Sequence, residues 1–169
     1  ARRVLEHIQR FANSENAPRD LFESGVQREM RLVWGNTINA LMASQASVRG
    51  PHPQKLLCDE CDEMKLDILD AALGQTMSVE GIPAQTTLSS THQYADGTMT
   101  DILRRAAKNG WVVHTWCWRE TQEPHGWLSQ DEIERKRNEI PEGMWRTEYD
   151  LQEPAAESRA IQPNSVEQM

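Results

Sequence analysis

The sequence has no long apolar run and no excess of positive charge. No apolar stretch approaches the roughly 20 residues that a membrane-spanning helix needs. The start of the chain also lacks a basic segment followed by an apolar one, the pattern of an export signal. Lys and Arg number 18 against 26 Asp and Glu, a formal net charge of −8. The composition therefore predicts a soluble protein of the reducing cytoplasm, and it argues against attraction of the whole surface to nucleic acid.

Cysteine is also scarce, with three in 169 residues. Cys58 and Cys61 have C-x-x-C spacing, which occurs in zinc sites and in thiol redox sites. A structural zinc site needs four ligands, and the histidines that could complete one are scattered singly along the chain. These histidines are His52, His92, His114 and His125. The spacing leaves zinc binding and thiol chemistry open, but it favours Cys58 as a small buried residue of a strand.

Hydrophobic periodicity predicts alternating strands and helices over most of the chain. A helix is expected over residues 1–13 and a β-hairpin around Gly35-Asn36. The further predicted elements are strands at 55–58, 85–90 and 111–118, and helices at about 62–74, 97–108 and 129–140. The first of these strands, Lys55-Leu56-Leu57-Cys58, is a short apolar run of the kind expected for a strand buried on both faces. The alternation predicts an α/β domain with a mainly parallel sheet and helices on both faces.

The two ends of the sequence also suggest a domain organisation. The length suits one domain, which we expect to extend to residue 153. Residues 154–169 are rich in Pro, Ser, Glu and Gln and have no periodicity, as linkers do. The first predicted helix begins with neither Met nor an N-cap residue. We therefore expect the sequence to be an internal fragment of a longer protein.

Adjacent carboxylates follow the predicted strand at 55–58. Ligands of open α/β sheets bind at the carboxyl ends of the strands, where Asp59 and Glu60 would emerge. One carboxylate at such a place can hold Mg²⁺, while its neighbour orients or deprotonates a water molecule. Three hydroxyl residues, Ser89-Ser90-Thr91, follow the next strand and could sense a phosphate group. The ordinary alternatives are a solvated helix start for the acids and a turn or helix cap for the hydroxyls.

Three segments together resemble a known family. SVRGPHPQKLLCDECDEM, then TTLSSTHQYADGTM, then GMWRTEYDLQEP resemble the ATPase domain of the large terminase subunit of tailed bacteriophages. The resemblance implies a three-layer RecA-like P-loop fold, with Asp59 binding the Mg²⁺ of ATP and Glu60 as the catalytic carboxylate. It also implies that Ser89, Ser90 and Thr91 contact the nucleotide and couple hydrolysis to movement. Arg49 would be an arginine finger that neutralises charge on the transferred phosphoryl group.

The same resemblance implies partners and a missing part. The partners would be double-stranded DNA, the portal protein, the small terminase subunit and further copies in a ring. The complex would dock on the procapsid in the cytoplasm of the bacterial host. The sequence contains no G-K-[ST], so the Walker A loop and strand of a P-loop fold are missing from it. We therefore expect this chain alone to hydrolyse ATP negligibly, and an RNase H-like nuclease domain to follow it in the intact protein.

Other interpretations remain open at this point. A helicase-type P-loop ATPase would show the same strand-end acids, and a non-enzymatic α/β module would place them in solvent. The tryptophans could stack on bases, but core packing is favoured because Trp116 and Trp118 share one face of a predicted central strand. The other tryptophans considered are Trp111, Trp127 and Trp145.

Overall fold

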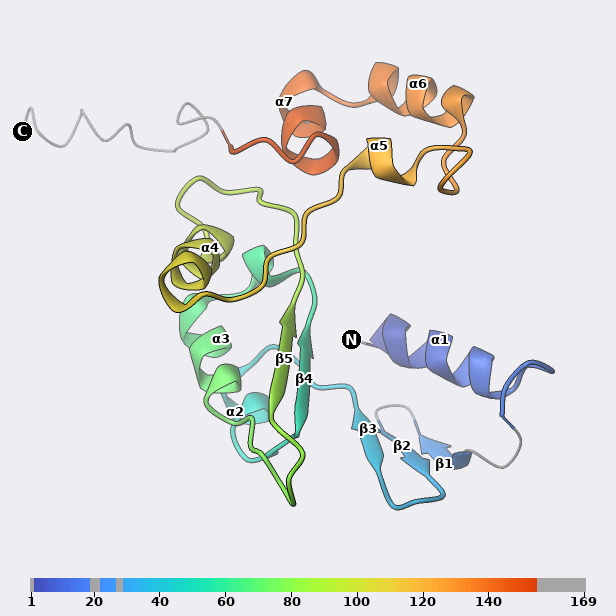
Figure 1. Ribbon diagram of the computed structural model, residues 1–169, viewed down its shortest axis with the longest axis vertical. Helices are drawn as coiled ribbons and strands as arrows, with labels where there is room; N and C mark the ends of the chain where they lie inside the picture. The colour runs from blue at the N-terminus through green and yellow to red at the C-terminus, as the bar shows by residue number, and fades with distance from the viewer. Residues whose placement is uncertain (1, 19–21, 27–28, 155–169) are drawn as a thin grey trace, which may run out of the picture. The chain divides into compact units, whose positions relative to one another are not determined.

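A computed structural model describes residues 2–18, 22–26 and 29–154 of the chain (Figure 1). The chain divides into two compact units. The first contains Ala1–Leu56 and Asp67–Thr86, and the second contains Leu57–Leu66 and Thr87–Met169. No helix in the described part is long and apolar enough to cross a membrane.

The first unit contains a helix and an antiparallel sheet. Helix α1 spans Arg2–Ala12, as the sequence predicts. Strands β1 (Phe22–Val26), β2 (Glu29–Leu32) and β3 (Thr37–Asn39) pair antiparallel in that order. The predicted hairpin between β2 and β3 is confirmed, and Gly35 in its turn has the positive φ of 82° that favours glycine. β1 was not predicted, because a Ser-Gly pair interrupts its apolar pattern.

Two further helices belong largely to the first unit. Helix α2 (Gln45–Val48) begins at Ser44, whose hydroxyl accepts a hydrogen bond from the backbone N–H of Ser47. Helix α3 (Leu66–Leu73) buries Leu69 and Ala72 and ends before Gly74. The predicted helix over 62–74 therefore starts later than expected. A short 3₁₀ turn, η1 (Cys61–Glu63), precedes α3, and the extended backbone of Met64 separates the two.

Strands β4 (Lys55–Cys58) and β5 (Gln85–Leu88) form the second sheet. The backbone N–H of Gln85 donates to Gln54 O at 2.8 Å, and that of Ser89 donates to Cys58 O at 2.9 Å. Four residues further along one strand, the bond is to a residue four further along the other. The two strands therefore run in the same direction, so the pair is parallel. The molecule is thus a mixed α/β protein with a small parallel sheet.

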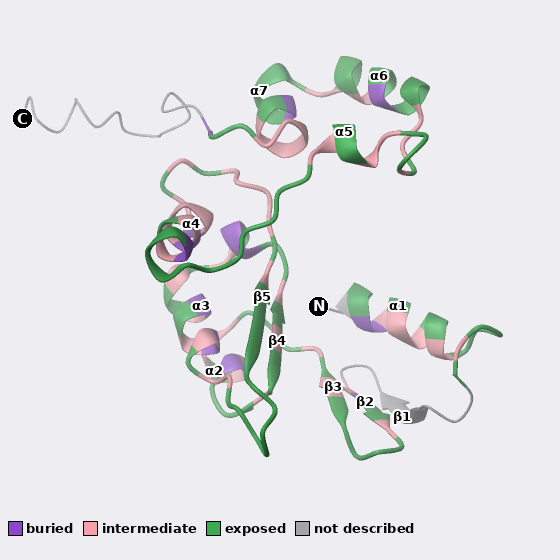
Figure 2. Ribbon diagram, in the orientation of Figure 1, coloured by how far each residue is buried: buried purple, intermediate pink, exposed green. Residues whose placement is uncertain are grey.

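The expectation that β4 is buried on both faces is wrong. Its residues alternate between exposed and intermediate, and the Leu57 side chain is 73% exposed. A parallel strand is buried on both faces only when helices cover both sides of its sheet. Among the described residues this sheet has two strands, which leaves apolar side chains of β4 in contact with solvent. Figure 2 shows the same exposure along both strands.

Helix α4 (Thr98–Asn109) follows β5 in the second unit. Its start agrees with the predicted helix within one residue. Ile102 and Ala106 are buried on one face, and the helix packs against η1 (Cys61–Glu63). Gly110 ends it in the left-handed conformation, with φ 66° and its N–H bonded to Ala106 O. The apolar periodicity therefore located this helix correctly from the sequence.

The predicted strand at 111–118 is not present. Residues 111–117 are irregular, and Trp118 begins the short helix α5 (Trp118–Thr121). No hydrogen bond joins the backbone of residues 112–116 to any other described residue. A strand needs a neighbouring strand to bond its backbone, and high β-propensity does not supply one. Trp116 is 62% exposed, so its expected packing under a helix is also wrong.

The last described segment is helical. Helix α6 (Gln130–Glu139) begins at the predicted cap, where Ser129 Oγ accepts from Glu132 N–H at 3.3 Å. Helix α7 (Glu142–Met144) leads into a π-helical turn, η2 (Trp145–Tyr149). The predicted linker lies outside the described residues after Pro154.

An aromatic cluster organises this segment. The Trp145 side chain is 1% exposed and stacks on Tyr149, with ring centroids 4.5 Å apart and an interplanar angle of 2°. Trp118 packs against it at 5.9 Å, and the indole N–H of Trp118 donates to Asp150 Oδ1 at 2.9 Å. Arg119 also pairs with Asp150 at 2.9 Å. The core-packing interpretation is therefore confirmed for Trp145, whereas Trp118 is half-buried beside it.

Candidate active site at the strand ends

The carboxyl ends of β4 and β5 lie side by side and are joined by backbone hydrogen bonds. Ser89 N–H donates to Cys58 O, and Cys61 N–H donates to Ser89 O at 3.1 Å. The two loops that leave these strands carry the predicted acids and the predicted hydroxyl residues. Parallel pairing places both loops at one edge of the sheet, as the sequence analysis expected.

Asp59 and Ser89 are in direct contact at this edge. Ser89 Oγ donates a hydrogen bond to Asp59 Oδ1 at 2.8 Å, and both residues are exposed. Asp59 Oδ2 has no hydrogen-bond partner among the described residues. A carboxylate and a hydroxyl are hard oxygen donors, and Mg²⁺ commonly takes one or two protein oxygens together with water and phosphate. These residues thus fit the Mg²⁺ that the family resemblance implies.

Glu60 lies beside Asp59 in an uncommon backbone conformation. Its φ of 54° and ψ of 48° fall in the left-handed region, which costs about 1–2 kcal/mol for a residue with a side chain. The residue is the N-cap of η1, so this conformation forms the turn from the strand into the 3₁₀ helix. The Glu60 side chain is exposed. Such backbone strain is frequent at functional sites, and here it occurs at the predicted catalytic carboxylate.

The other two hydroxyl residues have different contacts. Ser90 Oγ accepts from the backbone N–H of Asp62 at 3.1 Å, which ties the β5 loop to η1. Thr91 Oγ1 accepts from the Gln93 side-chain amide at 2.9 Å. Of the three predicted residues, Ser89 contacts a candidate acid, whereas Ser90 and Thr91 stabilise the loop after β5.

Asp62 follows Asp59 by three residues and lies in η1, where it is 5% exposed. Its Oδ2 accepts from the backbone N–H groups of Gln93 at 2.8 Å and Tyr94 at 3.0 Å. Its Oδ1 accepts from Met99 N–H at 2.7 Å, in the first turn of α4. A buried carboxylate is stable when such donors satisfy it. Asp62 therefore joins η1, the loop after β5 and the start of α4.

Gly97 makes room for this arrangement. It is the N-cap of α4 and has no side chain to accept from the first turn, so the Asp62 carboxylate takes that role. A Cβ atom at position 97 would collide with Asp62 Oδ1 and would lie 2.8 Å from the Cβ of Tyr94. Neither the role of Asp62 nor that of Gly97 has a signal in the sequence, since both depend on contacts across more than 30 residues.

Two further contacts fix the same loop. Thr98 is buried, and its hydroxyl donates to Met64 O at 2.6 Å. The Tyr94 hydroxyl donates to Glu63 Oε1 at 3.0 Å, and this hydrogen bond to a carboxylate raises the pKa of Tyr94 above its ordinary value. The Thr98 contact links the residue after η1 to the start of α4, and the Tyr94 contact links η1 to the loop after β5.

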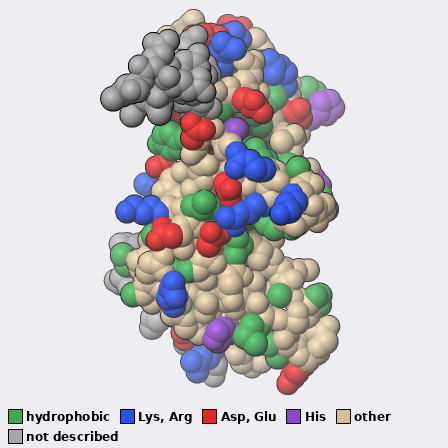
Figure 3. Space-filling view, turned by 90° about the vertical axis from the view of Figure 1, so that its left-hand side faces the viewer, with side chains coloured by type: hydrophobic (Ala, Val, Ile, Leu, Met, Phe, Trp, Pro, Cys, Tyr) green, Lys and Arg blue, Asp and Glu red, His purple; other side chains and the backbone are tan. Residues whose placement is uncertain are grey.

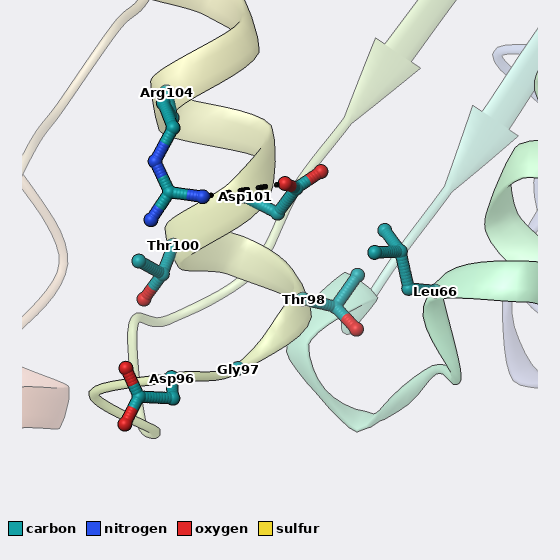
Figure 4. A pocket seen from close by; sticks show the side chains of 7 residues that line it. All are labelled: Leu66, Asp96, Gly97, Thr98, Thr100, Asp101 and Arg104. Atoms are coloured by element: carbon teal, nitrogen blue, oxygen red, sulfur yellow. Dashed lines mark hydrogen bonds and ion pairs between the residues drawn. The ribbon is translucent and has the colours of Figure 1, made fainter. Parts of the chain in front are cut away.

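A hollow of ≈ 280 Å³ lies at the start of α4 (Figure 4). Asp101 and Arg104 project from the helix into its lining and form an ion pair at 3.5 Å. The remaining lining residues are Leu66, Asp96, Gly97, Thr98 and Thr100. None of the residues predicted as functional from the sequence lines this hollow, so it does not coincide with the Asp59–Ser89 contact.

The predicted arginine finger cannot be assigned to this site from the geometry. Arg49 ends α2 in the first unit, where its Nε donates to Gln45 Oε1 at 2.9 Å. The two acids belong to the second unit. The role of Arg49 therefore stays a prediction from the family resemblance.

The two neighbouring thiols form a polar pair at the same turn. Cys58 is half-buried, whereas Cys61 has no exposed surface. A hydrogen bond from the Cys61 thiol lowers the pKa of Cys58, and the same bond together with burial raises the pKa of Cys61. Within the described part of the chain, no group of three or more His, Cys, Asp or Glu could hold a metal ion. The zinc interpretation thus lacks further ligands there.

On the face shown in Figure 3, Lys and Arg side chains are interspersed with Asp and Glu and form no uniform basic patch. No family model, curated protein or solved structure matches the chain. Support for a function therefore comes from the residues at the strand ends and their geometry.

Proposed function

We propose that this chain is the carboxylate-bearing part of the ATPase motor of a terminase large subunit, which drives viral DNA into a procapsid. The observation that carries the proposal is the 2.8 Å hydrogen bond from Ser89 to Asp59 at the shared carboxyl edge of two parallel strands. This is the edge where α/β proteins bind nucleotides. Parts of two of the three segments that resemble the family, Asp59-Glu60 and Ser89-Ser90-Thr91, follow these strands.

In this proposal Asp59 and Glu60 have different roles. Asp59 is a ligand of the Mg²⁺ that accompanies ATP, and the bound ion supplies neutralisation of the phosphate charge. Glu60, next to it and exposed, positions a water molecule and accepts its proton. The strained backbone at Glu60 holds the second carboxylate at the turn rather than in the strand. Two adjacent carboxylates can thus carry out different steps.

The contacts of the β5 loop suggest how hydrolysis is coupled to movement. Ser89 bonds to Asp59, so a change at the carboxylate acts directly on the end of β5. Ser90 and the buried Asp62 connect that loop to η1 and to the first turn of α4. The proposed output is therefore a shift of α4 relative to the strand ends. The motor would transmit that shift to double-stranded DNA.

The proposal includes parts that this sequence does not contain. In a RecA-like P-loop core, a G-K-[ST] loop binds the phosphates, and β4 and β5 would be two strands of a larger parallel sheet. Arg49 would act on the nucleotide of a neighbouring subunit in a ring. The portal protein and the small terminase subunit would be the partners on the procapsid. The chain by itself should hydrolyse ATP negligibly.

The test compares variants of the full-length product of the gene. Mg²⁺-dependent ATP hydrolysis should be lost in Asp59→Asn and in Glu60→Gln. Glu60→Gln should still bind ATP, because it removes the base and leaves the proposed metal ligand. The matched control is Glu63→Gln, a nearby exposed acid whose amide can still accept from Tyr94. It should keep wild-type turnover.

Two outcomes would contradict the proposal. One is full ATPase activity in the full-length Glu60→Gln protein. The other is ATP hydrolysis by the present 169-residue chain that Glu60→Gln abolishes, because that chain has no G-K-[ST] loop. Wild-type folding of each variant, judged by circular dichroism, ensures that lost activity reports on chemistry.

A further inference from the structure

The Cys58–Cys61 pair lies at the turn between β4 and η1. Cys58 is the last residue of the strand, and Cys61 is the first residue of the 3₁₀ helix. The left-handed backbone of Glu60 turns the chain between them, and the Cys61 thiol donates a hydrogen bond to Cys58 O at 3.3 Å. The turn therefore holds the Cys61 thiol against the backbone of Cys58, and both cysteines are free thiols.

The two thiols differ in accessibility. Cys58 is half-buried, whereas Cys61 is 0% exposed. Cys58 is therefore the more accessible of the two thiols to a reagent from solution, and Cys61 is protected in the fold. This combination of an accessible thiol and a protected neighbour is the arrangement that forms intramolecular disulfides efficiently.

We propose that Cys58 and Cys61 form a reversible thiol–disulfide exchange site whose co-reactant is a low-molecular-weight disulfide such as oxidised glutathione. The Cys58 thiolate attacks one sulfur of that disulfide, forms a mixed disulfide and releases one thiolate, which takes up a proton. Cys61 then loses its proton and attacks the Cys58 sulfur, which releases the second thiol. In total, two protein thiols are oxidised to one disulfide, and one small disulfide is reduced to two thiols.

The disulfide would enclose the two candidate catalytic acids. Asp59 and Glu60 are the residues between the cysteines, so the ring would constrain the turn that carries both carboxylates. If the proposed ATPase function holds, the oxidation state of this pair regulates the same site. The thiol chemistry itself depends only on the cysteines, and its test needs no ATP hydrolysis. A failure of one proposal is therefore distinguishable from a failure of the other.

The experiment treats the folded chain with oxidised glutathione at neutral pH, then alkylates the remaining thiols and maps them by mass spectrometry. Wild-type protein should lose both alkylatable thiols at positions 58 and 61 and retain no glutathione there. The Cys61→Ser variant should instead keep one glutathione on Cys58. The Cys58→Ser variant should leave Cys61 unmodified until the protein is unfolded. Cys117 is the internal control, since it can carry glutathione but has no neighbouring thiol to release it.

Three results would overturn the inference. Glutathione could stay on Cys58 in wild-type protein, Cys58 could remain unmodified while Cys117 reacts, or Cys61 could react in folded Cys58→Ser protein as fast as Cys117. The wild-type product alone decides between a disulfide and a mixed disulfide. The proposal therefore stays testable even if a serine variant fails to fold. Addition of a reducing thiol should restore both alkylatable cysteines.

Discussion

Replacement of Asp62 is the most direct test of how the second unit is held together. The buried carboxylate accepts from three backbone N–H groups, those of Gln93, Tyr94 and Met99, at 2.7 to 3.0 Å. Asp62→Ala leaves all three donors without this acceptor. Each unsatisfied buried donor costs about 1–3 kcal/mol, and partial relaxation toward water favours the lower end. We expect a loss of about 3–5 kcal/mol in the free energy of unfolding.

Asp62→Asn is the milder variant of the same experiment. One oxygen remains as an acceptor, while the new NH₂ group faces a backbone N–H and cannot bond to it. We expect Asp62→Asn to lose about 1–3 kcal/mol, because one or two of the three hydrogen bonds disappear. Glu63→Gln is the matched control, since this neighbouring acid is exposed. Its effect should stay within about 0.5 kcal/mol.

Urea unfolding followed by circular dichroism measures these differences. With an m-value of about 1–3 kcal/mol/M, a loss of 3 kcal/mol lowers the midpoint by roughly 1–3 M. Hydrogen exchange adds a local readout, because the amides of Gln93, Tyr94 and Met99 should lose protection together. Equal midpoints for Asp62→Ala and Glu63→Gln would refute the reasoning. Unchanged protection of the Met99 amide would refute the connection to α4.

Two further predictions concern the aromatic residues. Trp145→Ala should lower the free energy of unfolding by about 3–5 kcal/mol, because it empties a buried site. Trp145→Phe should lower it by less, because phenylalanine keeps an aromatic ring there. That variant also removes an indole N–H that has no partner among the described residues. Trp127 is 77% exposed, so Trp127→Ala should leave the urea midpoint nearly unchanged, and equal losses at both tryptophans would contradict the burial argument. The hydrogen bond to Glu63 raises the pKa of Tyr94. The contribution of this bond to the free energy of unfolding is therefore fully present below the pKa of tyrosine in the unfolded chain. It is lost as the pH rises through the pKa of Tyr94 in the folded protein. Glu63→Gln should lower the pKa of Tyr94 in a titration of phenolate absorbance assigned with Tyr94→Phe, and an unchanged titration would show that the bond is not formed.

Elements with strong local signals were predicted well. Gly35 tolerates positive φ and locates the hairpin, and Ser129 supplies a cap that begins α6. Gly110 similarly ends α4. In each case the decisive interaction joins residues at most four apart in the chain. Such interactions can be recognised in a single sequence, because they do not depend on where other elements lie.

The positions of β4 and β5 were predicted correctly, but features that depend on further neighbouring elements were not. The WVVHTW segment has the composition of a strand, but residues 112–116 find no described neighbour to complete a ladder. The apolar β4 was expected to be buried, but the described residues provide only β5 beside it. Strand propensity reports how a residue fits a pleated surface once that surface exists. It does not specify the neighbouring strand.

For the candidate site, the sequence by itself determined that two acids follow one strand and three hydroxyl residues follow the next. Only the tertiary structure decided that Ser89 contacts Asp59 and that Asp62 is buried and structural, although it follows Asp59 by three residues. The reason is physical. Residue types and short-range turns are encoded locally, whereas hydrogen bonds across 30 residues exist only after two strands have paired and brought their loops together.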